Sequence, residues 1–275
     1  MADMTGRDGV AEGPMSVQRA GWPTTVGLTT AMSVALLGSI DPVARAEHIA
    51  ARLAEAIQVG LILEGEKLPT ELQLADELGT APVTLREALA ILRDRGLVET
   101  RRGRGGGTFV RGSSTRSGSG HSRGELLRQR LATFSIHDLR ELGDHRRAIS
   151  SMSAALAADR ALPHEVAALR RRLDRLAQAD TMSQRRRADM LLTVEVAAAA
   201  QSSVLAREEL AMLSRIGDLT WWGRADDEHA VVVVERHRMI DAIARGDRRS
   251  AADSAESVVG ADTARLLALR LDMYQ

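Results

Sequence analysis

Residues 68–97, LPTELQLADELGTAPVTLREALAILRDRGL, contain the clearest signals of tertiary structure in the chain. Thr70 and Gln73 have the spacing of a capping box, which satisfies free backbone amides at the start of a helix. Gly79 then stands where a helix ends, and Pro82 suits the first position of the next helix. Two short helices joined by a turn that contains glycine predict a helix-turn-helix.

Apolar side chains at helical spacing define the face that each helix should bury. In the first helix we expect Leu72, Ala75 and Leu78 to be buried. The buried face of the second helix should consist of Leu85, Ala88, Leu89 and Leu92. A further helix is predicted from Asp41 to about Val59, followed by a short extended piece at 60–65.

A β-hairpin is predicted directly after the second helix. Residues 97–100 and 108–110 are typical of strands, and the turn between them, RRGRGGG at 101–107, combines arginine with glycine. Glycine lets backbone amides approach another surface closely, and phosphate is the surface that positive charge favours. We therefore interpret the hairpin as a wing beside the second helix.

Composition and periodicity indicate a second domain that is helical. A chain of 275 residues predicts about two domains, and 2% aromatic residues with six prolines favour packed helices over a sandwich or barrel. Without cysteine there is no disulfide, thiolate metal site or cysteine nucleophile, which points to a reducing compartment. Helical patterns cover 126–134, 138–161, 165–179, 186–200, 204–222, 229–244 and 248–273.

The predicted fold class is mainly α, with a winged helix-turn-helix followed by an antiparallel helical bundle. We expect a winged domain at 41–111, a Ser/Gly-rich linker at 112–124 and the bundle at 125–275. Residues 1–40 are expected to be a disordered arm or to precede the true start of translation. Part of the arm, 24–40, mimics a secretory signal, but glycines interrupt it and it is too short to span a bilayer, so we expect a cytoplasmic protein.

Charge is unevenly distributed although the formal net charge is zero. Between residues 86 and 123 there are nine arginines and three acids, a local charge of +6. Most charge runs are simply solvated, but this one coincides with the helix-turn-helix and the hairpin, as expected of a DNA-binding head. The predicted DNA contacts are Thr84, Arg86, Arg101, Arg102, Arg104 and Gly105.

Catalysis is not indicated by any motif. The chain has no P-loop, dinucleotide fingerprint, G-x-S-x-G elbow or H-E-x-x-H, so an enzyme is not expected. The main alternative to a regulator is an architectural DNA-binding protein without a small-molecule effector.

Several blocks in a fixed order resemble the winged head of GntR-type bacterial transcription regulators. They are LPTELQLA at 68–75, LREAL at 85–89, RDRGLV at 93–98 and RGRGGGTFV at 102–110. The helical remainder is similar to the FCD ligand-binding domain of the FadR-type branch. The segments that carry this similarity are 144–160, the Ala-rich helix after Ala188-Asp189, and 237–243.

The resemblance implies a homodimer that binds an inverted-repeat operator and a small organic acid or related metabolite. A repressor is expected, since a dimer over a promoter blocks polymerase sterically. The implied effector contacts are Arg146, Asp189 and His237. No membrane association is expected.

The sequence departs from the family pattern in two regions. Ala81 and Pro82 stand where the family commonly has a hydroxyl residue and an arginine before the recognition helix. Many FCD domains bind a divalent cation with one Asp and three His, but only Asp189 and His237 fit here. Thr193 and Val259 stand at the other two ligand positions, so we expect a degenerate site with no metal or other cofactor, unless Glu195 or His229 compensates.

Overall fold

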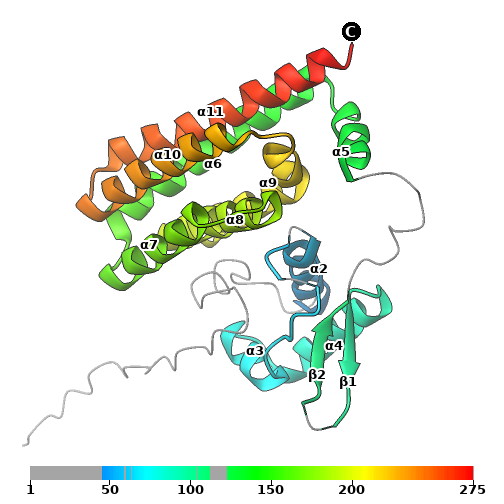
Figure 1. Ribbon diagram of the computed structural model, residues 1–275. Helices are drawn as coiled ribbons and strands as arrows, with labels where there is room; N and C mark the ends of the chain where they lie inside the picture. Colours follow the sequence, from blue (N-terminus) through cyan, green and yellow to red (C-terminus); the bar gives the residue numbers. More distant parts are fainter. Residues whose placement is uncertain (1–44, 59, 63, 104, 112–122, 275) are drawn as a thin grey trace, which may run out of the picture.

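The computed structural model describes residues 45–58, 60–62, 64–103, 105–111 and 123–274 (Figure 1). The predicted arm at 1–40 and the predicted linker as far as residue 122 lie outside the described residues. Within these ranges the chain forms ten helices and one two-stranded sheet. The predicted fold class, a winged helix-turn-helix followed by a helical domain, is therefore confirmed.

Three helices build the N-terminal head: α2 (Arg45–Gln58), α3 (Glu71–Glu77) and α4 (Pro82–Asp94). The capping box of α3 is present, because the Gln73 amide donates to Thr70 Oγ1 at 3.3 Å and the Thr70 amide donates to Gln73 Oε1 at 3.2 Å. Pro82 is the first residue of α4, and its four expected core residues are all buried.

The expected buried face of α3 was wrong in part. Leu72 is 71% exposed, Leu78 is half-buried, and Leu74 is buried beside Ala75. A helix of seven residues makes only two turns, and apolar residues at 72, 74, 75 and 78 fit two overlapping faces. The position of α4 decides which of them is buried.

The wing consists of β1 (Val98–Arg101) and β2 (Gly107–Val110), paired antiparallel with Glu99 opposite Phe109. The other edge of β2 is also paired: the Leu68 amide donates to the Thr108 carbonyl at 2.8 Å, and the Val110 amide donates to the Glu66 carbonyl at 2.9 Å. The extended piece thus lies at 66–68. Residues 60–62 form a turn instead of the extended segment expected at 60–65.

The C-terminal domain is formed by seven helices. They are α5 (Arg123–Ala132), α6 (Ile136–Arg160), α7 (Pro163–Ala177), α8 (Met182–Ala199), α9 (Ser203–Trp221), α10 (Asp226–Arg245) and α11 (Arg248–Asp272). Helix α5 begins within the last two residues assigned to the linker. Helices α6 and α11 lie side by side (Figure 1). Gly143 permits their close approach, because a Cβ at this position would overlap the side chain of Thr263.

The head packs against the C-terminal domain through α8 and α9, which lie next to α2 in Figure 1. Leu61 and Ile62 follow α2 and are buried in one apolar cluster with Leu191 and Val194 of α8. This shared core fixes the head on the helical domain by burial of apolar surface. No helix in the described ranges is long and apolar enough to cross a membrane.

Candidate DNA interface and buried charge cluster

The solvent-facing side of α4 carries two of the predicted DNA contacts. Arg86 is exposed, and its Nε lies 3.1 Å from Glu71 Oε2. An ion pair this exposed contributes little to stability, so Arg86 can exchange Glu71 for a phosphate or a base at low cost. Thr84 is half-buried at the start of the same helix. Val83 directly follows Pro82 at the start of α4 and is 58% exposed. It was not among the DNA contacts predicted from the sequence.

The wing presents further positive charge. Arg101 and Arg102 are exposed, and the guanidinium of Arg101 lies 2.7 Å from Glu99 and over the ring of Phe109 at 4.6 Å. Gly105 is exposed with a φ of 90°, in the left-handed region. Arg104 is outside the described residues. The contacts of these wing residues with DNA remain predictions.

The interior of the C-terminal domain contains a cluster of charged side chains from five helices and from the turn after α9. Arg146 of α6 lies 2.7 Å from Asp262 of α11, which also pairs with Arg224. All three are buried. Burial opposes the charge on Arg146, but the nearby carboxylates of Asp262 and Glu209 outweigh it, so the pKa of Arg146 is raised.

Asp189 of α8 is the second centre of this cluster. Its Oδ1 lies 2.9 Å from Arg236 Nε, and its Oδ2 accepts a hydrogen bond from Trp221 Nε1 at 3.1 Å. Burial would raise the pKa of Asp189, but the charge and hydrogen bond of Arg236 lower it below its ordinary value. The Arg236 guanidinium also donates to Thr193 Oγ1 at 3.0 Å.

Glu209 of α9 completes the cluster. Its Oε1 accepts a 2.5 Å hydrogen bond from the Ser150 hydroxyl. Burial raises the pKa of Glu209, and this effect exceeds the opposing influence of Ser150 and Arg146.

These residues do not fit a divalent cation. Arg236 places a guanidinium on Asp189 and Thr193, the two positions that should begin a metal site, and Val259 is buried and apolar. Glu195 lies 3.5 Å from Arg172, and no group of three His, Cys, Asp or Glu side chains suited to a metal occurs in the described part of the chain. His229 does not supply a substitute either, because its Nε2 lies 3.0 Å from the Leu176 carbonyl.

The structure brings two of the three predicted effector residues together. Arg146 and Asp189 both belong to the cluster, whereas His237 is exposed on α10. Adjacent helical residues point about 100° apart, so Arg236 faces inward where His237 was expected. The family spacing predicted His237 as the inward-facing residue. The apolar pattern of α10 would have placed Arg236 on the buried face instead.

The winged head with its exposed arginines, joined to a helical domain with a buried charge cluster, defines a bacterial-type transcription regulator. The chain combines a GntR head with an FCD domain: residues 45–110 match the bacterial regulatory proteins of the gntR family, and residues 141–261 match the FCD domain. The first of these families consists of regulatory proteins, and the relatives below are named as transcriptional regulators and not as enzymes.

Two mycobacterial regulators are similar in sequence. The HTH-type transcriptional regulator RmpR of Mycobacterium gastri is 38% identical over 172 residues, which cover 62% of this chain and 61% of that protein. The HTH-type regulator Rv0494 of Mycobacterium tuberculosis is 29% identical over 227 residues, covering 80% of this chain and 89% of that protein. Among solved structures, E. coli McbR/YncC matches with a TM-score of 0.48 and 18% identity, covering 84% of this chain and 98% of that one.

Proposed function

We propose that the protein is a cytoplasmic homodimeric repressor that binds an inverted-repeat operator and releases or tightens its hold in response to a small organic acid. The observation that carries this proposal is the exposed surface of the head, where α4 and the wing both present arginines to solvent. One recognition helix from each subunit would enter successive major-groove segments, and the symmetry of the dimer requires an inverted repeat.

Each part of the head has a separate task in this proposal. The planar guanidinium of Arg86 can grip the O6 and N7 of guanine or two phosphate oxygens. Val83 is apolar and exposed at the start of α4, which suits contact with a thymine methyl group. Arg101 and Arg102 of the wing bind the phosphate backbone and set the register of the head on the duplex.

The effector site is proposed at the buried charge cluster. Two buried atoms of the cluster, Arg146 Nε and Glu209 Oε2, have no hydrogen-bond partner among the described residues, and neither has Ser153 Oγ, one turn of α6 beyond Ser150. Buried polar atoms are nearly always satisfied, so these three support a ligand that supplies the missing partners. A carboxylate would accept from Arg146, and a hydroxyl group on the same small acid would bond to Glu209 or Ser153.

Binding of the acid changes the affinity for DNA if the acid binds two arrangements of the dimer unequally. A ligand shifts an equilibrium only through such differential binding. Helices α8 and α9 carry Asp189 and Glu209 of the cluster and also contact the head, so a change at the cluster has a direct route to the DNA-binding surface.

The proposal is tested by fluorescence anisotropy with the DNA upstream of the protein's own gene. Arg86→Ala and Arg102→Ala should each weaken binding by about 1–3 kcal/mol and lower the salt dependence, since each removes a cation from the interface. Arg249→Ala is the matched control, because its side chain is 93% exposed in the C-terminal domain. Unchanged affinity of both folded head variants at the same salt would overturn the proposal.

Effector binding has its own test. A thermal-shift screen of small organic acids should identify one that stabilises the parent protein through linkage. Arg146→Met should abolish that stabilisation while the folded variant still binds DNA. An architectural DNA-binding protein would be stabilised by DNA and by none of the acids.

A further inference from the structure

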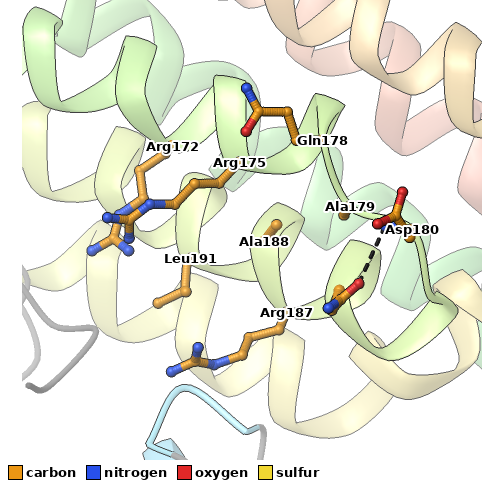
Figure 2. A pocket seen from close by; sticks show the side chains of 9 residues that line it. Arg172, Arg175, Gln178, Ala179, Asp180, Arg187, Ala188 and Leu191 are labelled. Atoms are coloured by element: carbon orange, nitrogen blue, oxygen red, sulfur yellow. Dashed lines mark hydrogen bonds between the residues drawn. The ribbon is translucent and has the colours of Figure 1, made fainter.

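A cavity of about 320 Å³ lies between α7 and α8, outside the buried charge cluster. Its walls are formed by Arg172, Arg175, Gln178, Ala179, Asp180, Gln184, Arg187, Ala188 and Leu191. Figure 2 shows the guanidinium groups of Arg172, Arg175 and Arg187 on the same side of this cavity, with Leu191 between them. At about 30 Å³ per water molecule, the cavity has room for a ligand of roughly ten non-hydrogen atoms.

The lining of the cavity carries more positive than negative charge, because it includes three arginines and one aspartate, Asp180. Arg172 is buried and pairs with Glu195 at 3.5 Å, whereas Arg175 is exposed and makes no ion pair within the described residues. Burial lowers the pKa of Arg172 and of Arg187, and the charge of Arg175 lowers both further. An anion in the cavity would relieve this repulsion.

One of these arginines also holds the head. Arg187 Nε donates to the Gly60 carbonyl at 3.2 Å, and its Nη2 donates to the Leu61 carbonyl at 3.3 Å. The same Nη2 lies 3.6 Å from Glu66 Oε2. The guanidinium therefore binds the turn that follows α2 and contacts Glu66 of the segment that pairs with the wing.

We propose that the cavity between α7 and α8 binds a small dianion, such as a phosphate group or a dicarboxylate, and that Arg187 couples its binding to the attachment of the head. Arg175 and Arg187 would hold the anion by charge-assisted hydrogen bonds, and the amides of Gln178 and Gln184 would orient it. The ligand would compete with residues 60–66 for the Arg187 guanidinium, and this competition would loosen the head.

The site does not depend on the proposed function, which enters only in the expectation that a looser head changes DNA affinity. The test therefore uses amide hydrogen exchange of the full chain without DNA, together with calorimetric titration of inorganic phosphate and, separately, succinate. Acetate serves as the monoanionic control for both probes.

We expect phosphate, succinate or both to bind more tightly than acetate, and to speed exchange at the amides of residues 60–68. Arg175→Ala should weaken that binding at least tenfold, whereas Arg171→Ala, an exposed neighbour on α7 that does not line the cavity, should leave it unchanged. If only one probe binds, its identity separates a phosphate group from a dicarboxylate.

Arg187→Ala should show fast exchange at 60–68 without ligand and no further change with it. If this variant fails to fold, Arg187→Lys replaces it, because lysine keeps the charge but lacks the planar guanidinium that reaches both carbonyls. Equal binding by the parent and Arg175→Ala, binding no tighter than acetate, or unchanged exchange at 60–68 in the saturated parent would each overturn the proposal. If the parent protein does not bind DNA, the proposed function is overturned, whereas the anion site is not.

Discussion

Arg236 Nε lies 2.9 Å from Asp189 Oδ1 in the interior of the C-terminal domain, and both side chains are buried. The same guanidinium donates to Thr193, so Arg236 bonds to both residues at the first two ligand positions of the family's metal site. A positive charge supplied by the chain itself thus stands beside Asp189.

Removing Arg236 should destabilise the protein strongly. In Arg236→Ala the Asp189 carboxylate would be buried without its cation, which costs about 3–5 kcal/mol and should appear as a large fall in Tm. Arg238→Ala is the control, because Arg238 is exposed and its ion pair in the described part of the chain is with Glu235 on the same helix. The double variant Asp189→Leu/Arg236→Met should recover much of the loss, since it leaves no unpaired charge. Equal melting temperatures for Arg236→Ala and the control would contradict the importance of this pair.

Metal removal should have no effect on folding or DNA binding. Because Arg236 bonds to both Asp189 and Thr193, a divalent cation would have to displace a guanidinium from the site. Dialysis against EDTA should leave the Tm and the operator affinity unchanged, and added Zn²⁺ or Ni²⁺ should produce no saturable heat in a titration. A stoichiometric metal that is recovered from the purified protein and stabilises it would refute this expectation.

The head should lose stability as the pH rises from about 4.5 to 7. Burial raises the pKa of Glu77 to about 7, and Asp76 adds to the shift. The folded state therefore binds a proton more tightly than the unfolded chain, so the stabilisation is complete below the ordinary pKa and is lost as the pH passes the raised one. Glu77→Gln should flatten this dependence and raise the Tm at pH 8.

The control for the pH experiment is Glu87→Gln, which changes an exposed carboxylate on α4. It should retain the pH dependence of the parent. Melting curves at pH 5 and pH 8 suffice to compare the three proteins, and a parent that is equally stable at both values would show that Glu77 titrates normally.

Alanine at Gly106 should damage the wing. A Cβ there would clash with the carbonyl oxygen of Arg101 and lie 2.9 Å from the carbonyl oxygen of Gly103, so the turn must change shape. We expect weaker operator binding with little change in Tm, because the turn carries arginines but no core residue. The control, Gly260→Ala on α11, places its Cβ 3.7 Å from the Arg147 guanidinium and should bind DNA normally. Identical affinities would show that the wing conformation does not matter for binding.

Local sequence was sufficient for the elements of the head and for the succession of helices. The capping box at Thr70, proline at the first position of α4 and the i, i+3, i+4, i+7 spacing from Leu85 depend on neighbours within one or two turns. Such short-range rules act before any tertiary contact forms, which is why these predictions agree with the structure.

The arginine run at 185–187 shows what short-range rules leave open. Arg185 pairs with Asp226 of α10 at 2.5 Å, Arg186 pairs with Asp218 of α9, and Arg187 binds the head. Three identical neighbours thus join α8 to three different parts of the protein. Their partners are distant in sequence, so the pattern of the run alone indicated only charge.

The helix-turn-helix, the wing and the helical character of the second domain can all be predicted from sequence, because capping, turn chemistry and periodicity are local. The tertiary structure alone decided that Leu74 and not Leu72 is buried, and that Arg236 and not His237 meets Asp189. These outcomes depend on how each helix is rotated against its neighbours, and that rotation is set by the packing of the whole core.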